Sequence, residues 1–343
     1  MFYFNFAHKV KNKNATKYYA RGTSMKRERI LNSLKTAYSY AASSVMHKPV
    51  MHGMPPAIST ELTNHCNLRC PECPSGSGTM KREKGFMDPG LFRGLMNELK
   101  PYLYNTSLYF QGEPMLHPQF FSFLAESAGI RTTVSTNGHF LSGENSRVIA
   151  GSGLSRLIIS LDGMDQDTYS TYRINGKVET VIGGIRNISE ERKRLGSGLI
   201  IEVQMLVNRY NENQITEIRK LADELKVRLV LKSMQIYGKA SIGNWLPSGS
   251  KYRRYRMKDG EYMIRSSMPR RCARLWFNPV VTWDGKVIPC CFDKDAEFVM
   301  GDLAKQNFRE IWQGQKFKDF RQRVLSEREK IGMCRNCTSG LRK

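Results

Sequence analysis

The sequence lacks the motifs that mark several large classes of enzyme. It contains no Gly-x₄-Gly-Lys-Ser/Thr phosphate-binding loop, no His-Glu-x₂-His zinc motif, no Gly-x-Ser-x-Gly nucleophile elbow and no Gly-x-Gly-x₂-Gly fingerprint after a strand. ATP hydrolysis, zinc proteolysis, serine hydrolysis and nicotinamide chemistry are therefore unsupported.

Long apolar runs are also missing. No uninterrupted stretch of about 18 apolar residues occurs, so the sequence predicts no membrane span. The opening MFYFNFAHKVKNKN has no sustained apolar core followed by a small-residue cleavage site, so we expect no signal peptide. The chain of 343 residues, 40% of them apolar, is long enough for one large domain and a smaller one.

Acidic residues are few: 31 Asp and Glu stand against 54 Lys and Arg, and the net charge is +23. The excess is concentrated in two segments. Residues 1–54 hold ten Lys or Arg against Glu28 alone, and residues 251–274 hold nine against Asp259 and Glu261. Such segments favour anionic partners such as phosphorylated substrates, lipid headgroups or nucleic acid, with a solvated surface that aids solubility as an equal alternative.

A helix is predicted at residues 26–46 within the first basic segment. Its apolar side chains fall along one side of the helix: Leu31, Leu34, Tyr38, Ala41 and Val45. We favour a helix that caps the main domain, and the alternative is a helix that lies on a membrane surface. Met25 is an alternative start of the protein.

The eight cysteines are bunched at spacings typical of metal ligands. Disulfide scaffolds are usually small and secreted, so we expect thiolate metal sites in a reducing cytoplasm. Cys66, Cys70 and Cys73 lie in the run TNHCNLRCPECPSG, and the others follow near the end of the chain: Cys272, Cys290, Cys291, Cys334 and Cys337. Three clustered thiols leave a metal site one ligand short, whereas four close it.

The middle of the chain alternates between strand and helix patterns. Strands are predicted at 56–62, 106–110, 131–136, 156–161, 199–207 and 227–232, with helices near 89–99, 118–128, 143–151, 178–194 and 212–225. This order predicts a parallel sheet, either an incomplete barrel or an open doubly wound sheet. Polar motifs follow the strands: QGEP (111–114), STNG (135–138), SLDG (160–163) and VNRYN (207–211). Their position favours the barrel, whose active site forms at the strands' carboxyl ends.

The spacing Cys-x₃-Cys-x₂-Cys suits a cubane iron–sulfur cluster in which three irons are bound by thiolates and the fourth iron is open. A zinc site would need a fourth ligand, and His65 is the local candidate. Because His65 is adjacent to Cys66, it is poorly placed to complete a tetrahedron, and we expect it to be a hydrogen-bonded loop residue.

These motifs together resemble the radical S-adenosylmethionine (SAM) superfamily, over about residues 56–235 and 270–339. The resemblance implies a partial (β/α)₆ barrel with a 4Fe–4S cluster on Cys66, Cys70 and Cys73. It also implies that SAM chelates the open iron, and that reductive cleavage yields a 5′-deoxyadenosyl radical that abstracts a substrate hydrogen.

The resemblance carries cofactor-binding roles to individual positions. Gln111, Gly112 and Glu113 match the motif that meets the methionyl amino group, although Gln111 replaces its first glycine. The remaining cofactor-binding positions are Ser135, Asn137, Ser160, Asp162 and Arg173, of which the last three match groups that hold the carboxylate and ribose. Glu72 stands where many members carry an aromatic residue.

The tail resembles the SPASM/twitch extension of that superfamily in its short form. A hairpin turning at Asp284-Gly285, a helix near 307–325 and Cys334-x₂-Cys337 carry the resemblance. It implies one auxiliary 4Fe–4S cluster held by Cys272, Cys290, Cys334 and Cys337. A four-cysteine zinc site is the alternative that the spacing permits. For Cys291 an alternative ligand, a substrate-facing acid or base, and a small buried residue all remain open.

We therefore expect a basic N-terminal extension (1–54), a radical SAM barrel (55–240), a basic linker (241–269) and an auxiliary-cluster domain (270–343). The expected reaction is a two-electron oxidation such as a dehydrogenation. The alternatives are peptide modification (a thioether or carbon–carbon crosslink, or formylglycine) and, in another class, a zinc-binding nucleic-acid adaptor.

The expected partners are a reductant such as flavodoxin or ferredoxin and a small-molecule or peptide substrate, with an anionic substrate as one option. Peripheral membrane contact through the basic N-terminus is a further expectation, and the sequence carries no strong nucleic-acid signal. The substrate pocket is expected near Lys232, Gln235 and Tyr237 after the sixth strand. No catalytic acid or base is assigned from the sequence.

Overall fold

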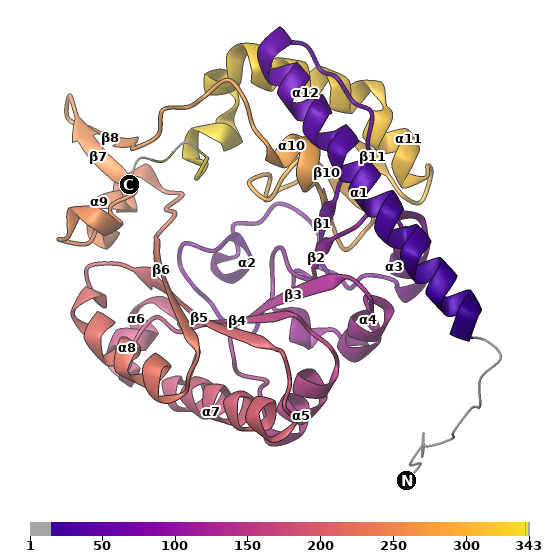
Figure 1. Ribbon diagram of the computed structural model, residues 1–343. Coiled ribbons are helices and arrows are strands. Elements are labelled where there is room, and N and C mark those ends of the chain that lie inside the picture. Colours follow the sequence, from indigo (N-terminus) through magenta and orange to yellow (C-terminus); the bar gives the residue numbers. More distant parts are fainter. Residues whose placement is uncertain (1–14, 340, 342–343) are drawn as a thin grey trace.

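The computed structural model describes residues 15–339 and 341. Six parallel strands form the central sheet in chain order (Figure 1). They are β1 (Ala57–Thr60), β2 (Asn105–Ser107), β3 (Arg131–Thr136), β4 (Arg156–Ser160), β5 (Ile200–Val207) and β6 (Arg228–Ser233). The predicted α/β fold with a partial parallel barrel is confirmed.

Helices cover the outer face of the curved strands (Figure 1). They are α3 (Pro89–Leu99), α4 (Phe120–Glu126), α5 (Gly143–Gly151), α6 (Gln166–Tyr172), α7 (Val178–Arg194) and α8 (Ile215–Glu224). The start of several is fixed by a side chain that accepts a backbone N–H, as Ser142 does for α5 and Asp165 for α6. Apolar residues at helical spacing, such as Val181, Ile185 and Ile188 of α7, are buried against the sheet.

The tail of the chain extends the same sheet beyond β1. β9 (Val280–Val281) pairs in parallel with β1, and β10 (Lys286–Ile288) and β11 (Gly301–Asp302) follow as antiparallel neighbours. The hairpin predicted at Asp284-Gly285 is present, with Gly285 at φ +80°. Cys290 therefore follows a strand that belongs to the barrel's own sheet.

The helices of the tail differ from the prediction at one point. Instead of one helix over 307–325, α11 (Phe308–Gln313) ends at Gly314, whose extended backbone separates it from α12 (Gln315–Glu327). Asn307 and Glu310 form a capping box at the start of α11. A short helix, α10 (Arg274–Phe277), follows Cys272.

The basic segment expected as a linker has structure of its own. It contains α9 (Ile242–Trp245) and a hairpin of β7 (Tyr255–Lys258) and β8 (Glu261–Ile264). Asp259 and Gly260 both have positive φ, at +52° and +77°, as a two-residue turn of this kind requires. Short 3₁₀ turns occur at Pro114–Leu116, Glu212–Gln214, Lys239–Ser241, Ser250–Tyr252, Arg328–Lys330 and Gly332–Asn336.

The first described element, α1 (Ala15–Met46), lies across the tail and the edge of the barrel (Figure 1). The segment after it is fixed by indole nitrogens, since Trp276 donates to Val50 O at 3.0 Å and Trp312 to Gly53 O at 2.9 Å. Across residues 15–339, no helix is long and apolar enough to cross a bilayer.

Candidate active site

Three thiols share the loop that follows β1. Burial is the main reason that the pKa of Cys66 is raised to about 12; the nearby charges of Glu113, Cys73 and Cys70 contribute to this rise, and the hydrogen bond from Leu68 N–H opposes it. Cys73 N–H donates to Cys70 O at 3.2 Å, and the short helix α2 (Pro74–Ser77) begins directly after Cys73. Because a bound metal takes the place of the thiol proton, this crowded set of thiols suits iron that accepts three thiolates.

The QGEP loop packs directly against the thiol loop. Gly112 has φ +71°, and a Cβ there would lie 2.5 Å from His65 O and 2.6 Å from Thr63 O. Glu113 N–H donates to His65 O at 2.8 Å, and Gly112 N–H donates to Ser75 Oγ at 3.1 Å. A glycine is therefore required for this approach of the two loops. The His65 ring stacks on Phe86, with 4.7 Å between the ring centroids.

The Glu113 side chain connects the QGEP loop to the end of β3. Its carboxylate is buried and accepts hydrogen bonds from Asn137 N–H (2.7 Å), Thr136 Oγ (2.8 Å) and Met115 N–H (3.2 Å). Burial raises its pKa to about 7 although these bonds lower it. Asn137 in turn donates from Nδ2 to Asn67 Oδ1 of the thiol loop at 2.7 Å.

Asp162 and Arg173 form a buried ion pair beside the thiol loop. Arg173 Nε donates to Asp162 Oδ2 at 2.6 Å, and Arg173 Nη1 lies 3.6 Å from Cys70 Sγ. Asp162 Oδ1 also accepts Leu206 N–H at 2.6 Å, which fixes the pair to β5. Burial opposes the charge of Arg173, yet its pKa is raised because Asp162 and Cys70 lie beside it.

Ser135 and Ser160 complete the set of expected cofactor-binding residues. Both are half-buried, Ser135 in β3 and Ser160 as the last residue of β4. The structure therefore brings the motifs of the first four strands together at the carboxyl end of the sheet, around Cys66, Cys70 and Cys73.

Glu72 has a role that the sequence did not indicate. Its carboxylate accepts Tyr237 N–H at 2.8 Å and the Ser241 hydroxyl at 2.7 Å. The thiol loop is thereby tied to the segment that follows β6. No motif marks this contact, because its partners lie more than 160 residues along the chain.

The four tail thiols line a single small cavity. Cys272, Cys290, Cys334 and Cys337 are all buried there. The cavity lining also includes Phe292, Phe320, Val324 and Arg328. The Arg328 side chain is fully buried, and its Nε has no hydrogen-bond partner within the part of the chain that the structure describes. An acceptor inside the cavity would satisfy it.

A cubane takes one thiolate on each iron, so its four ligands surround a volume instead of a point. Across residues 15–339, no three Cys, His, Asp or Glu side chains are placed to hold a single metal ion. The donor set and the buried arginine fit a fully thiolate-bound cluster.

The tail cavity is fixed against the barrel from two sides. Asn336, between Cys334 and Cys337, donates to Ile236 O at 2.8 Å and accepts the Tyr255 hydroxyl at 2.7 Å. On the other side, Arg82 pairs with buried Glu61 of the first strand's end and donates to Lys294 O at 2.9 Å. The two groups of thiols are thus held by one framework.

Comparison with known proteins decides the family. A model of the radical SAM superfamily matches residues 60–222, and a model of an iron–sulfur cluster-binding domain, SPASM, matches residues 272–338. The chain belongs to the radical SAM superfamily. This membership removes the reason to interpret the cysteines as those of a zinc-binding adaptor.

Individual relatives agree with this assignment. The S-adenosyl-L-methionine-dependent 2-deoxy-scyllo-inosamine dehydrogenase of Niallia circulans is 25% identical over 291 residues, which cover 82% of this chain and 92% of the relative. The crystal structure of BtrN with AdoMet and 2-DOIA shares the fold at a TM-score of 0.53 and 20% identity, covering 84% of this chain and 94% of that chain. Streptococcus suis SuiB bound to the precursor peptide SuiA reaches 0.60 at 14% identity, covering 99% and 80%.

This radical SAM enzyme is therefore of the oxidoreductase type. Its cofactors are SAM, a 4Fe–4S cluster that binds SAM in the barrel, and an auxiliary 4Fe–4S cluster in the SPASM domain. It requires a reductant and a substrate.

Cys291 lies outside the lining of the SPASM cavity. It is half-buried, and Arg274 Nη1 is 3.3 Å from its Sγ. Burial raises the pKa of Tyr109, and the nearby Cys291 raises it as well. Cys291 also acts to raise the pKa of Lys232. Cys291 and Arg274 therefore lie within electrostatic range of Lys232 in β6, and Cys291 also lies within range of Tyr109 in the segment after β2.

Lys232, Gln235 and Tyr237 were expected to line a substrate pocket. Lys232 and Tyr237 are accessible and Gln235 is half-buried. The Lys232 side chain is accessible, but neighbouring protein removes part of the water around it, and this desolvation lowers its pKa. Glu202 raises this pKa, whereas the charges of Arg274 and Arg156 lower it. Burial raises the pKa of Tyr237. The substrate pocket at these three residues stays a prediction.

Proposed function

We propose that the enzyme removes a hydrogen atom from its substrate and then completes a two-electron oxidation, such as dehydrogenation of an alcohol. When bound and reduced, the barrel cluster supplies the electron that splits SAM to methionine and the hydrogen-abstracting 5′-deoxyadenosyl radical. An auxiliary cluster held by Cys272, Cys290, Cys334 and Cys337 would accept the second electron from the substrate radical, and the proton would leave to water. Both lost electrons and both lost hydrogens are thereby accounted for.

The observation that carries this proposal is the set of four buried thiols around one cavity. Four protein ligands leave no iron open to bind substrate, so the role that remains for this centre is electron transfer. The match to the dehydrogenase of Niallia circulans over 92% of that relative's length supports the same reaction class.

For the barrel centre we propose Cys66, Cys70 and Cys73 as ligands, and Cys272, Cys290, Cys334 and Cys337 for the auxiliary centre. Around SAM we propose the motif residues Gln111, Gly112, Glu113, Ser135, Asn137, Ser160, Asp162 and Arg173. Their common location at the carboxyl ends of β1–β4 supports this set. Because Asp162 already occupies Arg173 Nε, the groups of Arg173 left for SAM are its terminal nitrogens.

We further propose an anionic substrate, bound by Lys232 and Arg274. Both side chains lie within electrostatic range of Cys291, and the charge of Arg274 lowers the pKa of Lys232. A flavodoxin or ferredoxin is the proposed reductant, whose acidic surface would complement the net charge of +23.

A peptide substrate is the second candidate. SuiB, which shares the fold, was crystallised with a precursor peptide, and this supports peptide modification as an alternative. In the described part of the chain, the structure outside the barrel and SPASM regions consists of α1, the segment after it and the small β7–β8 hairpin region.

The test uses the anaerobic holoenzyme and the Cys290→Ala variant. Wild-type protein should contain about eight irons and eight sulfides per chain. The variant should retain about half of each, still form 5′-deoxyadenosine, and lose the oxidised product because the substrate radical has no electron acceptor. Unchanged product formation by the variant would contradict the oxidation.

The substrate is found by deuterium transfer. Candidate anionic metabolites and peptides, labelled at single carbons, are incubated with the enzyme, SAM and dithionite. Label in 5′-deoxyadenosine identifies the molecule and the attacked carbon. Lys232→Gln should then raise KM for that substrate about tenfold, since a lost charged contact costs on the order of 1.5 kcal/mol.

A further inference from the structure

The helix α1 is attached to the body of the enzyme by its polar side. Asn32, Thr36, Ser39 and Ser43 follow one another at intervals of four, three and four residues and are all buried. Asn32 exchanges two hydrogen bonds with the backbone of Met54, at 2.9 and 2.8 Å, and Thr36 Oγ donates to Met54 O at 2.9 Å. The Tyr40 ring also packs on Trp276 and Phe277, so specific polar contacts and one aromatic contact hold this side of α1.

The opposite side of α1 is apolar and exposed. Leu31, Leu34, Tyr38, Ala41 and Val45 recur at intervals of three and four residues, so they share one face, which we call the apolar stripe. Leu34 and Tyr38 are each 62% exposed and Val45 is 79% exposed. A helix that only covered a core would bury these side chains and expose the serines and threonine. The observed arrangement is the reverse.

The surroundings of the apolar stripe are strongly basic. Lys26, Arg27, Lys35 and Lys48 are exposed on or beside α1, with Glu28 as the acidic residue among residues 26–48. Arg29 is used differently, since it donates to the backbone carbonyls of Lys100 and Gly129 and anchors the helix to the barrel. Positive charge beside an exposed apolar face is the pattern of helices that lie in the interface of an anionic bilayer.

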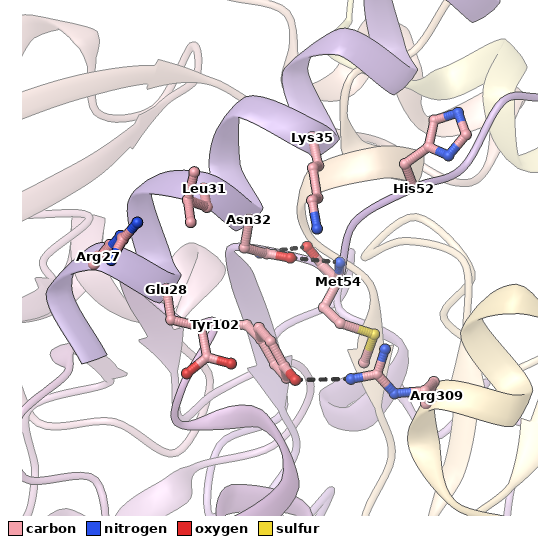
Figure 2. Close-up of a pocket in the computed structure, with 9 residues that line it drawn as sticks. All are labelled: Arg27, Glu28, Leu31, Asn32, Lys35, His52, Met54, Tyr102 and Arg309. Carbon is pink, nitrogen blue, oxygen red and sulfur yellow. Dashed lines mark hydrogen bonds between the residues drawn. The ribbon is translucent and has the colours of Figure 1, made fainter. Parts of the chain in front are cut away.

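A pocket of about 390 Å³ lies beside the apolar stripe (Figure 2). Its lining includes Arg27 and Lys35 from α1 and Arg309 from α11, with His52 and Tyr102. Arg309 Nη2 donates to the Tyr102 hydroxyl at 2.8 Å and is held over the Tyr102 ring. Three permanent cations and a single acid, Glu28, give this pocket the chemistry of a phosphate-binding site.

We propose that α1 docks the enzyme on an anionic phospholipid surface. The apolar stripe enters the headgroup region, Arg27, Lys35 and Arg309 bind lipid phosphates, and the buried polar side keeps α1 fixed to the enzyme. This places the tail side of the molecule against the bilayer. The proposal concerns the outward face of α1 and does not depend on the reaction proposed above.

The test is co-flotation of the full-length protein with vesicles. Vesicles of phosphatidylglycerol and phosphatidylcholine should carry the wild-type protein, and vesicles of phosphatidylcholine alone should not. The Leu34→Glu/Tyr38→Glu variant should bind at least tenfold more weakly. Neutralising one cation in Lys35→Gln should weaken binding about fivefold, and 0.5 M salt should weaken it for all proteins.

Val148→Glu supplies the matched control. Val148 is 44% exposed on α5, outside the face that α1 presents, so its variant should bind like the wild type. Iron content and circular dichroism should be unchanged in every variant because the replaced side chains are exposed. Equal flotation of wild-type and Leu34→Glu/Tyr38→Glu proteins would overturn the proposal. A dimer in solution that dissociates in this variant, without vesicle binding by the wild type, would assign the apolar stripe to a second copy of the chain and would also overturn it.

Discussion

Arg173 joins Asp162 to Cys70. Its Nε donates to the Asp162 carboxylate at 2.6 Å while its Nη1 lies 3.6 Å from the Cys70 sulfur. Both charged side chains are almost entirely inside the protein, with 13% of Arg173 and none of Asp162 exposed. One arginine thus couples the end of β4 to the thiol loop.

Removing this arginine should destabilise the protein because Asp162 would remain as an unpaired buried charge. We expect Arg173→Gln to lower the free energy of unfolding by about 3–5 kcal/mol. The Asp162→Asn/Arg173→Gln double variant should recover part of this loss, since both charges are gone. Urea unfolding of the metal-free proteins under reducing conditions measures the difference, and equal stability of the single and double variants would contradict the pairing.

The thiols of the barrel loop should be separable from Cys291 by substitution. Cys66→Ala is expected to abolish 5′-deoxyadenosine formation and leave about four irons per chain, because the barrel cluster loses one of only three ligands. Cys291→Ser is the control: it should keep about eight irons, since Cys291 lies outside the cavity that the other tail thiols line. Persistent 5′-deoxyadenosine in Cys66→Ala would refute the assignment of the loop.

Glu113 should make the stability of the metal-free protein depend on pH. Burial raises its pKa to about 7 from 4.5, so the folded state retains the proton that the unfolded chain has released. Stability from this group is complete below pH 4.5 and is lost as the pH rises through 7, by ~3 kcal/mol in all. Glu113→Gln should flatten this part of the profile in denaturation measured between pH 4 and 8, and an unchanged slope would rule the group out.

Gly112→Ala should disrupt the contact between the QGEP and thiol loops. The new Cβ would meet backbone atoms at 2.5–2.7 Å at a residue with φ +71°, so the loops must move apart. We expect a loss of several kcal/mol in stability and of most bound iron after reconstitution. Gly183→Ala in α7 is the matched control, because open space surrounds that position, and it should be neutral or stabilise by up to about 1 kcal/mol.

Much of the barrel could be predicted from local patterns. The strand and helix periods placed β3, β4, α3, α5 and α7 within one residue of their observed ends, because each buries one face against a single neighbour layer. The break of the tail helix at Gly314 was missed, since glycine within a helical pattern also occurs without a break. The β7–β8 hairpin was missed although Asp259-Gly260 is a turn signal, because the basic charge of the segment suggested a linker.

The site could be predicted only where motifs carry it. The thiols and the strand-end motifs follow from spacing, but the contacts of Glu72 with Tyr237 and Ser241 join segments far apart in the chain. The orientation of α1 was also beyond the sequence. Its apolar stripe was visible, but the polar contacts of Asn32 and Thr36 with Met54, which decide which side faces inward, depend on the fold of residues 50–54.

The pairing of β9 with β1 makes the last fifth of the chain part of the barrel's own edge. A protein shortened to end before residue 278 would leave the backbone groups of β1 that now meet Pro279 and Val281 without partners. Open strand edges recruit other chains, so such a fragment should self-associate and precipitate rather than survive as a one-cluster enzyme. Gain or loss of this module in evolution would therefore require a new means of covering β1.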